Sequence, residues 1–419
     1  MDKMKIHSGV RLNGVVEASG SKNSALPILF SCLLADGEHV LSNIPRLRDI
    51  DSSLQLLHHL GCKTEWIASN RLRVVVLGQG ETEAPYDIVR KMRASILVLG
   101  PLLARYGRAR VSLPGGCAIG TRPINMHLEG LKAMNADSRL EEGYVIAETS
   151  GLQGGRVLLE SPTVGGTENL MMAATLAKGK TFIENAAKEP EIVDLAHFLN
   201  KMGARIRGAG ESIIEIEGVD RLTPGPEHKV IPDRIEVGTL LIAGAITRGQ
   251  VTVKNCQPQD LEAVLVKLSD CGFQITTGES EIRLESPEEF KAVDVTTAPH
   301  PGFPTDLQAQ FMALMTQASG TSLITETIFE NRFMHVQELV RLNADITPKS
   351  RVAVVRGPSA LKGAPVMATD LRASACLVLA GLVAEGETEV QRIYHLDRGY
   401  ENLENKLSQL GAKISRVAT

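Results

Sequence analysis

Long apolar runs recur six times along the chain, and each run ends at a glycine that precedes a strand-like segment. The runs are apolar on nearly every side, which is typical of helices that are buried all round. Successive stop glycines lie 66 to 72 residues apart. They are Gly37, Gly107, Gly179, Gly249, Gly320 and Gly386. A fixed spacing of this kind predicts six copies of one structural unit.

A second pattern keeps the same spacing. After each apolar run comes an amphipathic helix that ends at glycine or asparagine, the residues that end helices in the left-handed conformation. These turn residues lie 68 to 74 residues apart, at Gly61, Asn135, Gly203, Gly272, Asn343 and Gly411. Each repeat therefore holds two helices and several strands. Chance recurrence of common helix stops is the alternative. We expect three repeats to close into one compact domain, twice.

The domain boundary is expected where proline and glycine are densest between the third and fourth repeats, from Pro224 to Pro232. The strands before about Gly20 precede the first apolar helix, and we expect them to pair with the last repeat. The chain then crosses between domains near Gly20 and near Ile231. The predicted domains are residues 22–231 and residues 1–21 plus 232–419, with the active site in the cleft between them.

Composition excludes several classes of function. The net charge of -4 and an aromatic content of 4% argue against a nucleic-acid-binding protein. The apolar runs are too short to span a bilayer, so no membrane association is expected. Six cysteines are scattered without a CxxC pair or a Cys/His cluster, which predicts a cytoplasmic protein without a metal site. No obligate protein partner is evident.

One loop carries candidate chemistry. The segment VSLPGGCAIGTRPINMH, residues 111–127, is too rich in glycine and proline for a helix or central strand, so it is expected to be exposed. It holds one thiol, Cys117, and one guanidinium, Arg122. A nearby cation would tune the acidity of the thiol. The alternative interpretation is a long surface turn with an incidental cysteine.

Cationic residues recur at turns and helix starts in several repeats. Helix N-termini combined with arginine or lysine form anion sites, because amide donors and side-chain charge point the same way. Six such groups facing one cleft would suit a substrate with several phosphates or carboxylates, although each alone could be a solvated surface charge. The set comprises Lys22, Arg93, Arg122, Arg332, Arg372 and Arg398.

Two carboxylates allow two interpretations each. Asp306 follows two prolines in HPGFPTD and opens a helix, so it could be an N-cap. It could instead be a general base for a sugar or alcohol hydroxyl. Asp370 in ATDLRAS has the same ambiguity.

Nine motifs resemble, from end to end, those of the UDP-N-acetylglucosamine 1-carboxyvinyltransferase (enolpyruvyl transferase) family. They read SGSKNSALP, KMRAS, LPGGCAIGTRP, ENAAKEPEIVD, IPDRIE, HPGFPTD, ETIFENRFMHV, ATDLRASA and YHLDRGYE. The resemblance implies an α/β (α+β) protein, a two-domain inside-out α/β barrel of six βαβαββ repeats, three per domain.

The resemblance also implies a reaction. The enolpyruvyl group of phosphoenolpyruvate is transferred to the 3-hydroxyl of UDP-N-acetylglucosamine, and phosphate is released. The reaction is addition–elimination through a tetrahedral ketal, without metal or organic cofactor. It is the first committed step of bacterial peptidoglycan synthesis, on which cell wall growth, shape and division depend, and the target of fosfomycin.

Site residues follow from the same resemblance. Cys117 would be the proton donor, and Asp306 would face the sugar 3-hydroxyl. The catalytic set is completed by Lys22 and Arg398. The residues expected to contact phosphoenolpyruvate are Lys22, Asn23, Arg122, Arg332, Arg372 and Arg398, with Arg93 lining the same site. Those expected to contact UDP-N-acetylglucosamine are Arg93, Arg122, Pro123, Ile124, Asn125, Met126, Ser161, Pro162, Thr163, Val164, Asp306 and Ile328.

Two positions depart from the family pattern. Asn125 stands where many members carry an acidic residue, and Ser161 stands where some carry lysine. Two other functions remain open. The sibling enzyme that acts on shikimate 3-phosphate shares the fold, although the loop with Cys117 favours the sugar-nucleotide enzyme. A non-catalytic sugar-nucleotide sensor is the other alternative.

Overall fold

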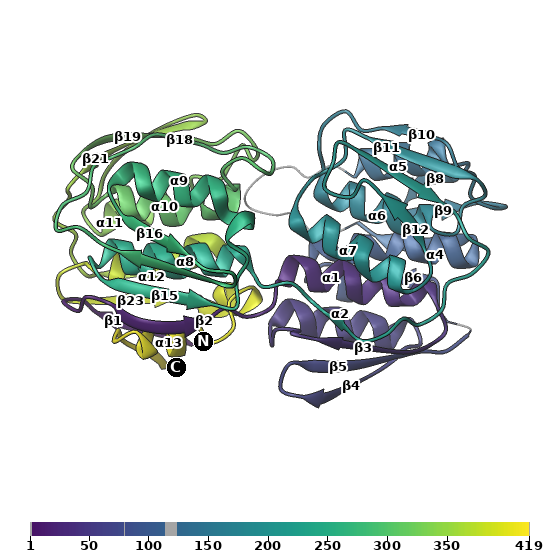
Figure 1. Ribbon diagram of the computed structural model, residues 1–419, viewed down its shortest axis with the longest axis horizontal. Coiled ribbons are helices and arrows are strands. Elements are labelled where there is room, and N and C mark those ends of the chain that lie inside the picture. The colour runs from purple at the N-terminus through teal and green to yellow at the C-terminus, as the bar shows by residue number, and fades with distance from the viewer. Residues whose placement is uncertain (1, 79, 114–123, 419) are drawn as a thin grey trace. The chain divides into compact units, whose positions relative to one another are not determined.

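The computed structural model describes residues 2–78, 80–113 and 124–418, and it divides into two compact units. One unit contains residues up to Ser19 together with the chain from Pro232 onward. The other contains the described residues between Gly20 and Ile231. The chain thus passes from one unit to the other on both sides of the Gly20–Ile231 segment. Figure 1 labels the elements of both units.

The unit from Gly20 to Ile231 contains three repeats. The elements of the first are β14 (His228–Lys229), α1 (Lys22–Ser31), η1 (Cys32–Leu34), β3 (Gly37–Ser42), α2 (Arg48–His59), β4 (Lys63–Ala68) and β5 (Arg71–Val76). Those of the second are β6 (Glu83–Ala84), α3 (Tyr86–Val89), η2 (Arg93–Val98), α4 (Leu99–Tyr106), β7 (Arg108–Ser112), α5 (Asn125–Ala133), β8 (Asp137–Glu141) and β9 (Tyr144–Glu148). Those of the third are β10 (Arg156–Leu158), α6 (Val164–Ala174), β11 (Lys180–Glu184), α7 (Pro190–Lys201), β12 (Arg205–Arg207) and β13 (Ile213–Glu217).

The other unit contains three more. The elements of the fourth repeat are β2 (Asn13–Glu17), α8 (Arg234–Ile246), β15 (Gln250–Lys254), η3 (Pro258–Leu261), α9 (Glu262–Cys271), β16 (Gln274–Thr277) and β17 (Glu281–Glu285). Those of the fifth are β18 (Val295–Thr296), η4 (Thr305–Leu307), α10 (Gln308–Met315), β19 (Gly320–Thr325), α11 (Val336–Arg341), β20 (Asp345–Lys349) and β21 (Val352–Gly357). Those of the sixth are β22 (Pro365–Met367), α12 (Leu371–Gly381), β23 (Glu387–Gln391), η5 (Ile393–Arg398), α13 (Leu403–Gln409), β24 (Lys413–Val417) and β1 (Lys3–His7).

Each repeat builds one four-stranded mixed sheet of the same design. In the order β18-β19-β21-β20, the first two strands are parallel and the other neighbours are antiparallel. The βαβαββ order is therefore confirmed in all six repeats. The six sheets are separate in the part of the chain that the structure describes, as expected for small sheets that lie outside a core of helices.

Strands from distant parts of the chain complete three of the sheets. β1 lies between β23 and β24, with Met4 opposite Val390. β2 pairs in parallel with β15, and β14 pairs in parallel with β3. The two N-terminal strands thus belong to the sixth and fourth repeats, and the strand before the second crossing belongs to the first repeat.

The apolar helix of each repeat forms the core of its unit. Every residue of α8 from Ile235 to Ile246 is buried, as is every residue of α12 from Arg372 to Gly381. In the second repeat this helix is divided into η2 and α4. Pro101 has no N–H for a bond to the carbonyl one turn earlier, which favours the break.

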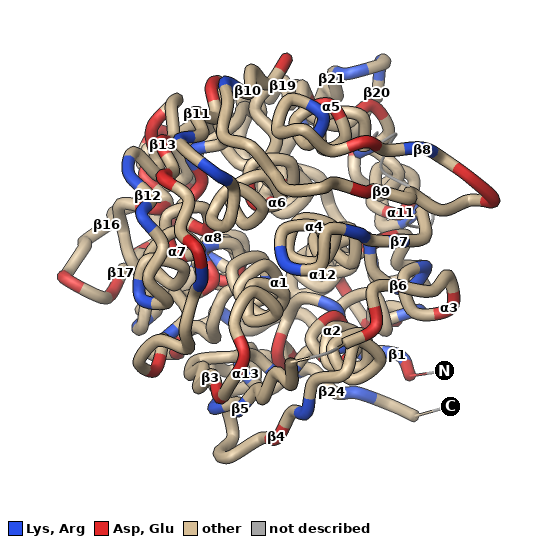
Figure 2. Tube along the Cα trace, turned by 90° about the vertical axis from the view of Figure 1, so that its right-hand side faces the viewer, with Lys and Arg blue, Asp and Glu red and all other residues tan. Residues whose placement is uncertain are grey.

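The amphipathic helices and the sheets cover these buried helices. In α2 the apolar residues Ile50, Leu56 and Leu57 are buried while the basic end is exposed. The outer faces of the sheets are charged, with cross-strand pairs such as Lys180–Glu215 at 2.6 Å. Figure 2 shows charges along β12 and β17, whereas α1 is almost free of them.

The stop residues behave as predicted, with one informative exception. All six turn residues of the second pattern have positive φ, for example 66° at Asn135. Five of the six stop glycines also do, whereas Gly249 does not. A Cβ at Gly249 would lie 1.9 Å from the Leu12 carbonyl oxygen, so close approach of the backbone requires this glycine.

No helix within the described ranges combines the length and the apolar character needed to cross a membrane.

Candidate functional site

Asp306 accepts hydrogen bonds from two arginines that come from different elements. It lies in η4, directly before α10. Arg332, in the segment before α11, donates from Nη2 to Asp306 Oδ1 at 2.6 Å. Arg372, near the start of α12, donates from Nη2 to Asp306 Oδ2 at 2.9 Å. The N-cap interpretation of Asp306 is wrong, because η4 begins after Pro304 and its cap has no side-chain hydrogen bond.

The two guanidiniums control the acidity of Asp306. Both are deeply buried, with side chains 5% and 4% exposed, and Asp306 is 27% exposed. Burial alone would raise the pKa of the Asp306 carboxyl, but Arg372 and Arg332 outweigh burial and hold this pKa well below its usual range. Asp306 is therefore ionised at neutral pH and is a weak proton acceptor.

The starts of three buried helices meet beside Asp306. Gln310 of α10 donates from Nε2 to the Asp306 carbonyl at 2.9 Å and to Tyr400 Oη at 3.0 Å. The same amide donates to Thr239 Oγ1 of α8 at 3.2 Å. Arg372 lies in the first turn of α12 and is close to Asp233, the N-cap of α8, so the N-termini of α8, α10 and α12 share one end of the unit. Helix N-termini and guanidiniums together make this end suited to anions.

Asp370 has the N-cap role, which is one of the two roles predicted for it. Its Oδ1 accepts from the backbone N–H of Arg372 at 2.9 Å and of Ala373 at 3.0 Å, so Asp370 is the N-cap of α12. His335 lies near Asp370 and Arg332, and burial lowers its pKa to about 4, so this imidazole is neutral at pH 7. Arg398 ends η5, and its neighbour Asp397 pairs with Arg416 at 2.6 Å.

Ile328 is positioned by a residue that the sequence analysis missed. The Ile328 N–H donates to Glu326 Oε1 at 2.7 Å, and Glu326 is 1% exposed. Thr305, which precedes Asp306, donates to Glu326 Oε2 at 2.7 Å. Glu326 lies inside the motif ETIFENRFMHV, but nothing in the sequence distinguishes it from the exposed Glu330 of that motif.

In the other unit, Lys22 opens α1 and pairs with a carboxylate. Its Nζ lies 3.1 Å from Asp49 Oδ2, and the two side chains are 11% and 4% exposed. Ser21 caps the helix by accepting from the Ser24 N–H at 3.3 Å. Asn23 follows Lys22 and is half-buried. Lys22 is therefore a cation at the N-terminus of α1, and Asp49 fixes its position.

The segments predicted to contact the sugar nucleotide meet at two further helix starts. Asn125 and Met126 open α5, and the Ser161–Val164 segment leads into α6. Ser161 Oγ lies 3.8 Å from Met126 Sδ. Thr163 caps α6 by accepting from the Gly166 N–H at 3.3 Å. Ile124 is the residue before α5, and Pro162 is exposed.

A buried histidine joins this group. His127 accepts at Nδ1 from Asn169 Nδ2 at 3.0 Å. Burial and the nearby Arg93 lower the pKa of His127 to about 4, so the imidazole is neutral and carries its proton on Nε2. Arg93 opens η2. The sequence analysis missed His127 and Asn169, although His127 directly follows the predicted contact Met126.

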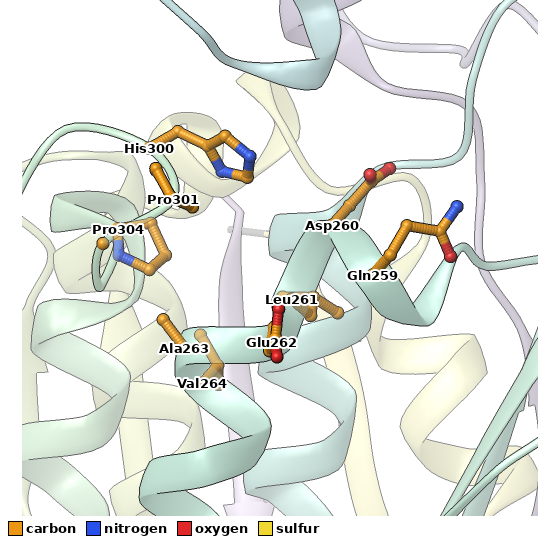
Figure 3. A pocket seen from close by; sticks show the side chains of 10 residues that line it. Gln259, Asp260, Leu261, Glu262, Ala263, Val264, His300, Pro301 and Pro304 are labelled. Atoms are coloured by element: carbon orange, nitrogen blue, oxygen red, sulfur yellow. The ribbon is translucent and has the colours of Figure 1, made fainter. Parts of the chain in front are cut away.

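Three predicted site residues, Cys117, Arg122 and Pro123, lie outside the described residues. Among the described ones, no three potential ligands gather in a metal-binding group. Figure 3 shows a pocket between the segments Gln259–Val264 and His300–Pro304, with an empty volume of about 210 Å³ that includes open solvent. None of the predicted site residues lines it.

Comparison with known proteins shows the family. Residues 6–407 match the family described as EPSP synthase (3-phosphoshikimate 1-carboxyvinyltransferase). The chain is 65% identical over 407 residues to a UDP-N-acetylglucosamine 1-carboxyvinyltransferase of Bdellovibrio bacteriovorus. The aligned region covers 97% of this chain and 98% of the relative. It is 56% identical over 417 residues to the protein of the same name from Thermodesulfovibrio yellowstonii, which covers 100% of both chains.

Solved structures agree. The enolpyruvyl transferase NikO from Streptomyces tendae superposes with a TM-score of 0.89 at 25% identity and covers 100% of this chain and 99% of its own. An EPSP synthase from Acinetobacter baumannii, at 17% identity and 100% coverage of both chains, shares the fold with a TM-score of 0.77. The chain therefore belongs to the EPSP synthase family of carboxyvinyltransferases, among the UDP-N-acetylglucosamine 1-carboxyvinyltransferases.

Proposed function

We propose that the chain transfers the enolpyruvyl group of phosphoenolpyruvate to the 3-hydroxyl of UDP-N-acetylglucosamine and releases phosphate. One observation carries the proposal: a chain 65% identical to an enzyme of that name holds Asp306 between two buried guanidiniums where three helix N-termini meet. Nucleotide diphosphate and phosphoenolpyruvate are both anionic, so a transferase for them needs such cationic ends.

The reaction requires addition followed by elimination through a tetrahedral ketal. A base takes the sugar hydroxyl proton, and an acid protonates the vinyl carbon. We assign the acid role to Cys117. We assign binding of phosphoenolpyruvate to Lys22, Asn23, Arg122 and Arg398, with Arg332 and Arg372 on the same substrate. Because Lys22 is held by Asp49, its ammonium is oriented before substrate arrives.

Asp306 is proposed to receive the sugar 3-hydroxyl. Its carboxylate is charged at neutral pH and fixed from two sides, so it can orient the hydroxyl toward the substrate carbon. Its low pKa makes complete proton abstraction unfavourable before the new bond forms. Proton transfer is therefore expected to accompany bond formation, when the hydroxyl becomes more acidic.

The sugar nucleotide is assigned to two groups of residues. Pro123, Ile124, Asn125 and Met126 are proposed to hold the uridine, and Ser161, Pro162, Thr163 and Val164 the diphosphate side, with Arg93 and Arg122 as cations. The contact between Ser161 and Met126 supports joining these segments into one site. Ile328 is proposed to contact the nucleotide sugar. An uncharged Asn125 and Ser161 leave the N-termini of α5 and α6 as the principal donors there.

The biological role follows from the reaction. We propose that the enzyme supplies the first committed intermediate of peptidoglycan and so supports cell wall growth, shape and division. A cytoplasmic location fits the five described cysteines, which are free buried thiols. We also propose that fosfomycin, an epoxide phosphonate that mimics phosphoenolpyruvate, alkylates Cys117.

Phosphate release tests the proposal. Purified protein is incubated with phosphoenolpyruvate alone, with UDP-N-acetylglucosamine alone, and with both, and phosphate and product mass are measured. Release that requires both substrates supports the assignment. Release with shikimate 3-phosphate instead identifies the sibling reaction. Binding of the sugar nucleotide without any phosphate release identifies a sensor.

A further inference from the structure

Glu326 is a buried carboxylate that accepts four hydrogen bonds. It follows β19 directly and is 1% exposed. Its Oε1 accepts from Thr297 Oγ1 at 2.8 Å, from the Ile328 N–H at 2.7 Å and from the Phe329 N–H at 3.2 Å. Its Oε2 accepts from Thr305 Oγ1 at 2.7 Å. One side chain thus joins β18, η4 and the backbone of the segment after β19.

The direction of these bonds is fixed by chemistry. Arg332 Nη1 donates to Thr305 Oγ1 at 3.0 Å, and a guanidinium can only donate. The hydroxyl proton of Thr305 is therefore directed to Glu326 Oε2. The other nitrogen of Arg332, Nη2, donates to Asp306. Glu326 consequently acts on Asp306 through Thr305 and Arg332, and on Ile328 through its backbone N–H.

We propose that Glu326 is a positioning residue for the sugar nucleotide. It fixes the position of the Ile328 backbone directly and that of the Arg332–Asp306 pair through Thr305. The inference rests on the proposed function, since Ile328 and Asp306 are assigned to that substrate. Glu326 is 1% exposed, so it is proposed to act through these residues and not by contact with substrate.

An amide cannot replace this carboxylate. If the glutamine oxygen faces Thr297, Ile328 and Phe329, its NH2 group faces Thr305, and the Thr305 proton loses its acceptor. If the amide is reversed, its NH2 group opposes three donors instead. Either way at least one buried donor is left unsatisfied, which is costly inside a protein. The isosteric change Glu326→Gln therefore tests the carboxylate and not the volume.

Steady-state kinetics provide the test. In Glu326→Gln we expect the KM for UDP-N-acetylglucosamine to rise about tenfold, because a hydrogen bond to a charged group is lost. The KM for phosphoenolpyruvate should rise less than that for the sugar nucleotide, because Glu326 reaches one assigned phosphoenolpyruvate contact, Arg332, through Thr305, and none of its own bonds goes to Lys22 or Asn23. A purely structural role would lower kcat through loss of folded enzyme and leave both KM values unchanged.

Variants at Thr305 separate the effect of Glu326 on Arg332 and Asp306 from its effect on the Ile328 backbone. Thr305→Val removes the hydroxyl that links Arg332 to Glu326, whereas Thr305→Ser keeps it and should restore most of the sugar-nucleotide affinity. Because Thr305→Val frees Arg332 from its anchor without changing any charge, the pKa of Asp306 should rise. The other titratable groups near this pair include the cation Arg372, the carboxylates Glu326, Asp233 and Asp370, and His335, which is neutral at pH 7. The acid limb of kcat/KM for UDP-N-acetylglucosamine should then move to higher pH.

A matched control comes from the same strand. Ser322 of β19 is fully buried and donates to the Val293 carbonyl at 2.6 Å, away from the assigned residues. Ser322→Ala should lower the melting temperature without changing either KM. The double variant Glu326→Gln/Thr305→Val should show less than the sum of the two single effects, because both break one chain of hydrogen bonds.

The outcomes distinguish the two proposals. If the parent enzyme shows no turnover with both substrates, the proposed function is wrong, and the positioning role proposed for Glu326 fails with it. If the parent turns over and folded Glu326→Gln has both KM values within twofold of the parent, the positioning role is wrong. Equal effects of Thr305→Ser and Thr305→Val, or fully additive double-variant effects, also contradict it.

Discussion

Asp306→Asn is the sharpest test of the described cluster, because it removes the single carboxylate that accepts from Arg332 and Arg372. The two guanidiniums, 5% and 4% exposed, would keep their charge without this partner. Breaking a buried ion pair costs roughly 3–5 kcal/mol. Since Asp306 is 27% exposed and partly solvated, we take the lower end, about 3 kcal/mol of unfolding free energy.

Thermal unfolding measures this cost. In a unit of this size, 3 kcal/mol corresponds to a decrease of about 6–12 °C in Tm. Asp345→Asn is the control, because Asp345 pairs with Arg356 at 3.1 Å in the same unit but is 63% exposed. A surface pair contributes less than about 1 kcal/mol. If Asp306→Asn lowers Tm no more than Asp345→Asn, the reasoning about buried guanidiniums is wrong.

The pH dependence gives a second measurement. The folded pKa of Asp306 is depressed, so its stabilising contribution is complete above the unfolded value of about 3.9 and is lost as pH falls through the folded pKa. The Tm difference between parent and Asp306→Asn should be constant from pH 7 to about pH 5 and should narrow below that. Phosphate added at neutral pH should stabilise Asp306→Asn more than the parent, because it supplies the missing negative charge.

Three further outcomes are expected. Lys22→Ala should lower kcat/KM for phosphoenolpyruvate at least tenfold, since a charge-assisted hydrogen bond contributes roughly 1.5–3 kcal/mol; near-parent kinetics would show that this lysine does not bind the substrate. Cys117→Asp should keep turnover with its optimum at lower pH and resist fosfomycin alkylation by mass, whereas Cys117→Ala should bind sugar nucleotide without turnover. Gly249→Ala should lower Tm more than Gly179→Ala, because its Cβ meets the Leu12 carbonyl whereas Gly179 has open space; the reverse order would contradict the close-approach argument.

Periodic features of the fold could be predicted from the sequence. A helix buried on every side and a positive-φ turn leave a signal in local residue types, and Asn135 and Asn343 carry that signal as clearly as the glycines. Gly249 is a glycine for a different reason, since it is constrained by the Leu12 carbonyl, which lies just before β2 and 237 positions earlier in the chain. Sequence spacing cannot distinguish these two causes.

The candidate site also has residues that the sequence could predict and residues that only the structure shows. Asp306 and Asp370 both open helices after a turn, and only the structure shows that Asp370 caps α12 while Asp306 accepts from two arginines. Glu326 could not be found, because its partners Thr297 and Thr305 lie 29 and 21 residues away and are brought close by the parallel pairing of β18 with β19. The resemblance supplied residues that are expected to contact substrate, but not the residues that position them.

The interior place of β1 in its sheet has a consequence for synthesis of the chain. Its two neighbours are β23 and β24, and Lys5 pairs with Glu389 on one side and with Ser415 on the other. During synthesis β1 therefore leaves the ribosome long before its two partners, while the three repeats between Gly20 and Ile231 can fold during translation. A circular permutant that joins the paired ends near Lys3 and Val417 and opens the chain at Ser19–Gly20 would make both units contiguous. It would cross between units once, and both units could then fold in the order of their synthesis.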